Sequence, residues 1–426
     1  MSSKKYYSDT AWNFGAFGVQ AVSGALLNLV LMKYAGPGTL GIFNQLYAVF
    51  VIAGQLAVLG LNDSCQKHVA QFDSNDLEKS PLIAAALNCA FLTGLCGSFA
   101  LLVLSFGIAK TDMDSLSLGV RYLAPGVLFF VLNKVGLSIL NGEQKMRFYA
   151  VGQSTRAILV VAGCLFVGLS ELPKSFMGVA FTLSEFILFF LIFPPLRGHI
   201  IRTRKSVHVT RWMRQHFHFG ARALPHGFLT EAMIRIDVLM LSFFVSETQI
   251  GIYSFVAFFV EGVFQIPLVV RTVTNPIWTG VLIRRQAKEF FNIALRSVLI
   301  SGLSTLAVIA SILILFPTII SYFPKTEPVT SLHLLSILMT GLGIYSFFLP
   351  LDNMLLQGGR PGLQSLYMLI TASINVALNL YLIPTYHLQG AAVATAVSFA
   401  VSGPILCLMA YFALDFKFLI KQPATS

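Results

Sequence analysis

The chain contains few charged residues, and acids are the scarcer kind. Only 11% of its 426 residues are Asp, Glu, Lys or Arg, and 56% are hydrophobic. A soluble domain usually carries about 25% charged residues. The low proportion of charged residues in this chain therefore excludes a water-soluble fold. The mean hydropathy of +0.77 indicates instead a chain that lies largely in a lipid bilayer.

Motifs of catalysis and metal binding are also missing. The five cysteines form no CxxC pair, and we expect buried, reduced thiols. The sequence contains no Walker A loop, serine elbow, zinc-ligand motif or glycine-rich dinucleotide motif. We therefore predict no cofactor, no metal and no catalytic residue.

Long apolar runs, in contrast, are abundant. A helix that spans a bilayer needs about 20 mostly apolar residues. Twelve runs fit this length: 13–35, 41–62, 81–109, 118–141, 149–169, 176–196, 220–245, 249–273, 291–316, 331–356, 363–383 and 390–412. Pro350 interrupts one of them and Asp352 follows. The longest gap is 197–219, so we predict an all-α polytopic membrane protein with no large soluble domain between its spans.

Three short patterns occur twice, in the same order. The pairs are Leu40-Gly41-Ile42-Phe43 with Ile250-Gly251-Ile252-Tyr253, Leu140-Asn141-Gly142 with Leu356-Gln357-Gly358, and Pro173, Gly178 and Ala180 with Pro384, Gly390 and Ala392. The offsets are 210 to 216 residues, about half the chain. In a membrane protein such a duplication points to a transporter with two lobes around a central site. We predict six-helix lobes at 1–196 and 220–426, joined by the segment 197–219.

The basic residues are distributed unevenly between the two sides of the membrane. Counted over the gaps, 18 of the 29 Lys and Arg residues lie on the side of the N-terminus and 3 on the other side. Because positive charge accumulates in the cytoplasm, both termini and the basic segment 197–219 are predicted to be cytoplasmic. The net charge of +11 then reflects topology, and we predict no nucleic-acid partner.

The segment 197–219 interleaves basic and apolar residues. This pattern is typical of a partly helical segment at the cytoplasmic headgroup boundary. Its four histidines have no acidic or cysteine neighbour in the sequence, so we do not expect a metal site: His199, His208, His216 and His218.

Charges inside the spans are candidate functional residues, because each costs about 3 kcal/mol or more at the bilayer centre. Several lie near span ends, where a long side chain reaches the headgroups: Lys33, Arg121, Arg222, Arg271, Arg296 and, as an acid near an end, Asp352. The others lie deeper: Lys134, Arg156, Glu185, Glu231, Arg235, Asp237 and Glu261.

The seventh predicted span is the most polar. Glu231 and Arg235 are four residues apart and share one side of a helix, where they would pair. Asp237 lies on the opposite side. The pair is either structural or part of a polar cavity. Further polar residues on other spans serve either helix contacts or an aqueous cavity: Asn13, Gln20, Gln153 and Gln265. Together with the surplus of positive charge, they favour a hydrated cationic cavity.

Three stretches carry a resemblance to a known family. They are Gly36-Pro-Gly-Thr-Leu-Gly41-Ile-Phe, the sequence Asp237-Val-Leu-Met-Leu-Ser-Phe-Phe with Ile250-Gly251-Ile-Tyr253 and Pro276 behind it, and Leu382-Ile-Pro384 with Gly390-Ala-Ala-Val-Ala-Thr395. The chain resembles, over its whole length, the polysaccharide-unit flippases of bacterial surface-glycan synthesis. Its motifs are mostly Gly, Pro and aromatic residues at helix ends.

The resemblance implies a MATE-like fold in the bacterial cytoplasmic membrane. Two six-helix lobes, related by a pseudo-twofold axis along the membrane normal, would surround a cationic cavity that opens alternately to each side. The cargo would be an undecaprenyl-diphosphate-linked oligosaccharide for O-antigen, capsule or exopolysaccharide. Membrane lipids and the glycan polymerase machinery would be its other partners.

The physics of this cargo assigns roles to the buried polar residues. Lys134, Arg156 and Arg235 are candidates for the diphosphate, because cations bind phosphate through charge-assisted hydrogen bonds. The four amides would bind sugar hydroxyls. Asp237 and Glu261 would orient the basic residues or carry a coupling proton, and Glu185 and Glu231 are structural or coupling charges. Synthesis of the cargo in the cytoplasm and its polymerisation outside would also drive transport in one direction without a coupling ion.

Three alternatives remain open from the sequence. Lipid II flippases of the same superfamily usually have two more helices at the C-terminus. Its drug and cation antiporters usually carry an acidic site in the first lobe, where Glu185 is here the one buried acid. A polytopic enzyme, such as a glycan polymerase or an acyltransferase, needs an acid–base pair at the membrane face, and the short external gap at Asp112 and Asp114 offers none.

Overall fold

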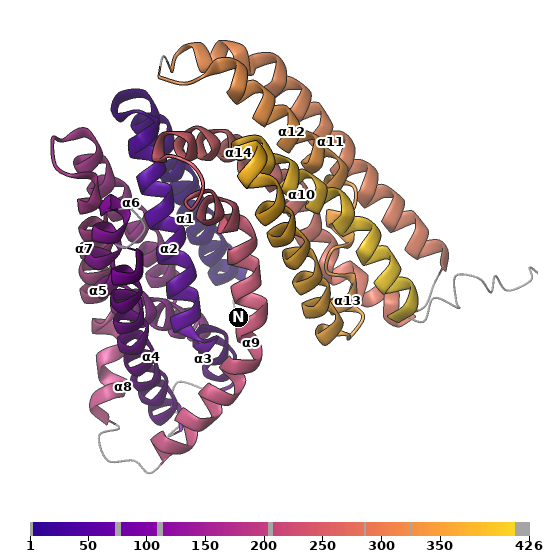
Figure 1. Ribbon diagram of the computed structural model, residues 1–426. Coiled ribbons are helices and arrows are strands. Elements are labelled where there is room, and N and C mark those ends of the chain that lie inside the picture. Colours follow the sequence, from indigo (N-terminus) through magenta and orange to yellow (C-terminus); the bar gives the residue numbers. More distant parts are fainter. Residues whose placement is uncertain are drawn as a thin grey trace, which may run out of the picture. The chain divides into compact units, whose positions relative to one another are not determined.

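A computed structural model describes residues 3–72, 78–108, 114–202, 208–284, 287–323 and 325–413 (Figure 1). All regular secondary structure in these ranges is helical. The chain divides into two compact units, Met1–Arg235 and Ile236–Ser426. Each unit is described by itself.

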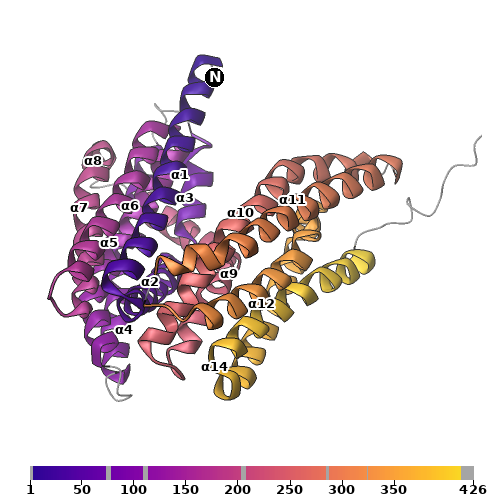
Figure 2. The same ribbon diagram turned by 90° about the horizontal axis from the view of Figure 1, so that it is seen from above.

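The first unit consists of a bundle of long helices with short ones at its ends. Its helices are α1 (Ser3–Val30), continued by a π-helical turn at Leu31–Ala35, α2 (Pro37–Val58), α3 (Leu61–Val69), α4 (Lys79–Ile108), α5 (Asp114–Gly142), α6 (Met146–Leu169), α7 (Met177–Ile192), α8 (Arg197–Arg202) and the first part of α9 (His208–Leu241). Helix α5 is the centre, because it packs against α2, α3, α4 and α7 (Figures 1 and 2). Gly126 permits this approach, since a Cβ atom there would lie 2.9 Å from the Thr182 Cα atom of α7.

The second unit contains the end of α9 and five further helices. These are α10 (Glu247–Arg284), α11 (Ala287–Ser321), α12 (Pro328–Ser346), the short α13 (Met354–Gln357) and α14 (Pro361–Ala413). Helix α14 is two helices joined at His387, whose φ of 50° and ψ of −124° are not helical. Pro384 lies just before this kink and cannot donate a backbone hydrogen bond. After the kink Gly390 folds back so closely that a Cβ atom would lie 2.4 Å from the Leu382 carbonyl oxygen.

The helices agree with most of the predicted spans. Within the described residues, ten helices are long and apolar enough to cross a membrane. Because α14 contains both 363–383 and 390–412, these ten helices hold eleven of the twelve predictions. The twelfth, 220–245, lies in α9, whose charges keep it outside this set.

One span boundary was predicted wrongly. The span at 331–356 ends earlier, because α12 stops at Ser346 and a 3₁₀ turn at Leu349–Leu351 follows around Pro350. The lobe boundaries at 196 and 220 stay a prediction. The first compact unit extends to Arg235 and so includes α8 and most of α9.

The basic segment 197–219 is partly helical, as predicted, and it packs on the first unit. Residues 203–207 lie outside the described residues. The Trp212 Nε1–H donates to Glu78 Oε2 at 2.9 Å, and the His216 Nδ1 lies 2.8 Å from the Ser64 hydroxyl of α3. Burial lowers the pKa of His216, and nearby His68 lowers it further, to about 4 despite a hydrogen bond to the Leu82 carbonyl. A neutral, buried His216 therefore fastens α9 to the first unit.

The other histidines of this segment serve separate contacts. His199 lies 3.3 Å from Glu143 and His208 lies 2.9 Å from Glu78. The described residues contain no group of three His, Cys, Asp or Glu side chains that would hold a metal ion.

Candidate functional site

The first unit buries an ion pair between α6 and α7. The Arg156 Nε atom lies 2.8 Å from Glu185 Oε1, and the Arg156 Nη2 atom donates to Glu185 Oε2 at 3.2 Å. The Glu185 side chain is fully buried, and the Arg156 side chain is 19% exposed. The ion pair and this hydrogen bond hold the guanidinium against the carboxylate. Glu185 therefore offsets the charge of Arg156, which the sequence had assigned to the diphosphate.

Helix α5 completes this cluster. The Asn133 side-chain amide donates to Glu185 Oε2 at 2.7 Å and to the Glu185 backbone carbonyl at 2.8 Å. Such hydrogen bonds offset the cost of burying a charged pair. The next residue, Lys134, donates to the Gln55 side-chain oxygen of α2. Among the described residues no carboxylate forms an ion pair with the Lys134 ammonium group.

Aromatic rings connect these cations to Arg235. The Lys134 and Arg156 cations lie 5.5 Å and 5.1 Å from the centre of the Phe130 ring. The Arg235 guanidinium lies 4.2 Å from the centre of the Tyr47 ring. Successive ring contacts at 5.0 to 6.0 Å lead from one end to the other: Phe130 to Phe50, Phe50 to Phe181 and Phe181 to Tyr47.

We call this series Phe130, Phe50, Phe181 and Tyr47 the aromatic run. A cation over a ring face is attracted by the π electrons. Glu231 and Arg235 are both half-buried, and no ion pair joins these two described residues. The role of Glu231 stays a prediction.

The second unit holds its buried acid with neutral groups. Asp237 is 8% exposed. Its carboxylate accepts hydrogen bonds from the Tyr253 hydroxyl of α10 at 3.0 Å, from the Asn379 amide of α14 at 2.8 Å, and from the Thr395 hydroxyl. No Lys, Arg or His in the described part of the chain forms an ion pair with Asp237. Asn379 also donates to Asn375 at 2.9 Å.

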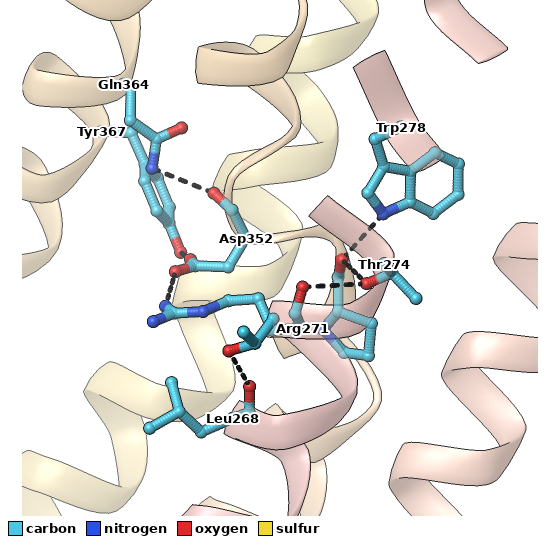
Figure 3. Close-up of polar contacts among 9 residues, drawn as sticks. Leu268, Arg271, Thr274, Trp278, Asp352, Gln364 and Tyr367 are labelled. Atoms are coloured by element: carbon cyan, nitrogen blue, oxygen red, sulfur yellow. Dashed lines mark hydrogen bonds and ion pairs between the residues drawn. The ribbon is translucent and has the colours of Figure 1, made fainter. Parts of the chain in front are cut away.

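An ion pair in this unit replaces a contact that the sequence assigned to lipid headgroups. The Arg271 Nη1 atom of α10 lies 3.0 Å from Asp352 Oδ2, and the Tyr367 hydroxyl donates to Asp352 Oδ1 at 2.9 Å (Figure 3). The Gln364 amide donates to the Asp352 carbonyl, and the Trp278 indole donates to the carbonyl of Pro350. Arg271 and Asp352 thus hold the break after α12 in place instead of reaching toward headgroups.

Three of the four predicted sugar ligands form hydrogen bonds within their own helices. The amides of Gln20, Gln153 and Gln265 donate to Ala16, Tyr149 and Glu261, each four residues earlier on the same helix: 3.2 Å, 3.2 Å and 3.5 Å. Asn13 is half-buried, and Glu261 is exposed. Their role in sugar binding stays a prediction.

Several residues of these clusters escaped the sequence analysis. Gln55, Asn133, Asn375 and Asn379 are uncharged and lie within apolar runs. Asn375 and Asn379 have the spacing of one helix turn, which is a weak sign of a shared polar face. Thr395 belongs to the closing stretch of the resemblance, but nothing in the sequence placed it against Asp237.

Two solved structures share this fold over almost the whole chain. A multidrug-resistance MATE family transporter in an inward-facing conformation has a TM-score of 0.77 at 17% identity, covering 95% of this chain and 96% of the other. The lipid II flippase MurJ in an inward closed conformation has a TM-score of 0.70 at 16% identity, covering 95% of this chain and 88% of the other. The chain therefore has a MATE-like fold, as predicted.

Sequence relatives extend over almost the whole chain. The putative O-antigen transporter of Shigella flexneri is 20% identical over 405 residues, covering 91% of this chain and 94% of that protein. The probable flippase AglR of Haloferax volcanii is 24% identical over 417 residues, covering 94% of this chain and 82% of that protein. No family model matches the chain. These relatives are named as a transporter and a flippase, not as enzymes, which agrees with the resemblance read from the sequence.

Proposed function

We propose that this protein is a flippase for an undecaprenyl-diphosphate-linked oligosaccharide, which it moves from the cytoplasmic to the outer leaflet for surface-polysaccharide synthesis. The observation that carries the proposal is the pair of cations at the two ends of the aromatic run. Lys134 and Arg235 have no ion-pair partner among the described residues, so both offer positive charge to a diphosphate. The full-length relatives support this class of cargo.

Arg235 is the stronger of the two candidates. Its guanidinium lies 4.2 Å from the centre of the Tyr47 ring, and this cation–π contact holds the group in place. A planar guanidinium binds a phosphate through two parallel hydrogen bonds, which an ammonium does not reproduce. Arg235 would thus hold the diphosphate, and Tyr47 would hold Arg235.

Lys134 and Arg156 would together form the second phosphate-binding position, at the Phe130 end of the aromatic run. Because Glu185 offsets the charge of Arg156, the net positive charge at the Phe130 end of the aromatic run comes from Lys134. Arg156 then contributes its remaining N–H groups and the rigidity of its pair with Glu185. The apolar faces of the sugar rings would stack on an accessible aromatic side chain. Tyr47, which is half-exposed, is the candidate.

Asp237 would carry a coupling proton. Three neutral donors hold its carboxylate, and no cation of the described residues offsets its charge. A buried carboxylate without a counter-charge is costly, and a bound proton removes that cost. Glu261, on α10, is the alternative carrier.

The export assay tests the cargo site directly. In a bacterial strain that lacks its own flippase, Arg235→Ala and Lys134→Gln should abolish surface-glycan export at normal protein levels, and Arg235→Lys should restore only part of it. The matched control is Arg121→Ala, because the Arg121 guanidinium lies 4.4 Å from the Phe106 ring but outside the aromatic run. Full export by Arg235→Ala would remove Arg235 from the site. Translocation of lipid II instead of the oligosaccharide carrier would favour the lipid II flippase alternative.

The membrane orientation is proposed from the positive charge of the gaps. Both termini and 197–219 would lie in the cytoplasm of a bacterium, and contact with the polymerase machinery would be on the outer side. In a variant without its native cysteines, Ser206→Cys and Thr425→Cys should resist a membrane-impermeant thiol reagent in intact cells. Thr326→Cys should react. Labelling of Ser206→Cys from outside would reverse the orientation.

A further inference from the structure

A cavity of about 350 Å³ lies in the first unit between the ends of three helices. Its lining residues come from α5, α6 and α7: Leu140, Arg147, Phe148, Val151, Leu191 and Ile192. All of these side chains except Arg147 are apolar. The volume lies at the small end of the range of about 300–1,000 Å³ for small-molecule sites. The lining suits a hydrocarbon chain that ends beside a single positive charge.

The surface around this cavity faces the lipid. Helix α7 exposes a continuous row of large apolar side chains, each 40–60% exposed in the structure: Leu183, Phe186, Ile187, Phe190 and Leu191. A membrane-spanning helix with such a face contacts hydrocarbon, because the same surface in water would be an aggregation site. Leu191 belongs both to this face and to the cavity lining, so the cavity is within reach of a lipid chain.

Arg147 marks the headgroup level at this cavity. Its guanidinium lies 5.3 Å from the ring of Trp12, and Trp is enriched where a membrane meets water. Arg147 is exposed, and within the described residues no carboxylate forms an ion pair with it. The neighbouring Lys79 and Lys145 differ, because both are bound to Glu143 at 3.3 Å and 2.8 Å.

We propose that this cavity binds an anionic phospholipid of the cytoplasmic leaflet. The phosphodiester of the lipid would accept hydrogen bonds from the Arg147 guanidinium, and one acyl chain would lie against Leu140, Val151 and Ile192. A single arginine matches the single charge of a phosphatidylglycerol headgroup. The ammonium group of a zwitterionic lipid would be repelled at the same place. This site is separate from the aromatic run, and it does not depend on the nature of the transported cargo.

Native mass spectrometry of the full chain in detergent tests this site. The purified protein is titrated with phosphatidylglycerol or with phosphatidylcholine, and the lipid-bound fraction is measured. The wild type should retain phosphatidylglycerol in preference. Arg147→Gln should weaken its binding about tenfold, the size expected for the loss of hydrogen bonds to a charged group. Arg147→Lys, which keeps the charge, should lose less.

Two further variants separate this site from non-specific attraction. Arg214→Gln removes another exposed arginine of the first unit and should bind as the wild type does. Val151→Trp fills the cavity and keeps Arg147, so it should also weaken binding of the two-chain lipid, with an unchanged melting temperature as the check on folding. Equal binding by Arg147→Gln, an equal loss in Arg214→Gln, or stronger retention of a polyprenyl phosphate than of phosphatidylglycerol would each overturn the proposal.

Discussion

Two buried acidic side chains, Glu185 of the first unit and Asp237 of the second, are held in opposite ways. In the first unit Glu185 meets the Arg156 guanidinium at 2.8 Å. In the second unit Asp237 accepts hydrogen bonds from Tyr253 and Asn379, at 3.0 Å and 2.8 Å, and has no ion-pair partner among the described residues. A paired carboxylate fixes geometry, whereas one that is held by neutral donors still has a charge to be neutralised. The proposed coupling role therefore falls to Asp237 and not to Glu185.

The largest effect on stability is expected at the paired acid. Glu185→Gln leaves the Arg156 guanidinium buried without a counter-charge, and breaking a buried pair in this way costs about 3–5 kcal/mol. Unfolding of the purified protein in detergent, followed by heat or denaturant, measures this loss. The double variant Glu185→Gln/Arg156→Gln removes both charges and should recover much of it. If the double variant is as unstable as the single one, the pair is not what stabilises this region.

A second charged cluster of the first unit, around Glu143, should make its stability depend on pH. Burial alone would raise the pKa of Glu143, but hydrogen bonds from His199 and Lys145 and the charges of Lys145 and Lys79 outweigh it and lower the pKa from 4.5 to about 2. A carboxyl group with a lowered pKa in the folded state contributes stability that is complete above its unfolded pKa and lost as pH falls through the folded value.

The free energy of unfolding should therefore fall by up to about 3 kcal/mol between pH 4.5 and pH 2 because of Glu143. Denaturant unfolding across this pH range measures the slope. Glu143→Gln should lack this part of the slope, and the exposed Glu171→Gln should keep it. A wild-type slope in Glu143→Gln would show that this cluster does not carry the acid sensitivity.

The ion pair of the second unit should have an intermediate effect. Asp352→Asn removes the charge that Arg271 meets and weakens the contact with the Tyr367 hydroxyl, so we expect a loss of about 1–3 kcal/mol. Arg360→Gln removes an exposed charge nearby and serves as the control in the same unfolding measurement. If the two variants are equally stable, Arg271 behaves as the sequence predicted and reaches the headgroups instead.

Asp237 should show the smallest effect on stability and a large one on coupling. The hydroxyl groups of Tyr253 and Thr395 donate or accept, so an amide of the same shape is accommodated, and Asp237→Asn should cost less than about 1 kcal/mol. Transport into vesicles with an imposed pH gradient should lose its dependence on that gradient. Glu261→Gln should keep it. The reverse outcome would assign the proton to Glu261.

The sequence was sufficient for the spans because lipid leaves the backbone little choice. A polar backbone group in hydrocarbon must bond within its own segment, so each apolar run of sufficient length becomes a helix. The unit boundary could not be predicted in this way. It depends on the contact of His216 with Ser64, 152 residues away in the chain, and no local pattern encodes such a contact.

The candidate site shows the same limit. The apolar composition of their spans and the free-energy cost of a charge in the bilayer identified Arg156 and Glu185 as buried charges. Their pairing depends on how α6 and α7 are rotated about their axes. The sequence does not determine these rotations, because both helices carry hydrophobic residues on all sides. The same is true of Asp237, whose partners lie 16 to 158 residues away. Conversely, the spacing of Glu231 and Arg235 indicated that the two could pair, but in the structure the Arg235 guanidinium lies over the Tyr47 ring.

The kink at His387 has a consequence for how the chain enters the membrane. The two spans of α14 are joined by a bend at one residue, and Gly390 lies against the backbone at Leu382. Tyr381 and Tyr386, exposed near the bend, suit an interface between lipid and water. We therefore expect the insertion machinery to release both spans together as one hairpin. Almost no polar residues at its tip would have to cross the bilayer.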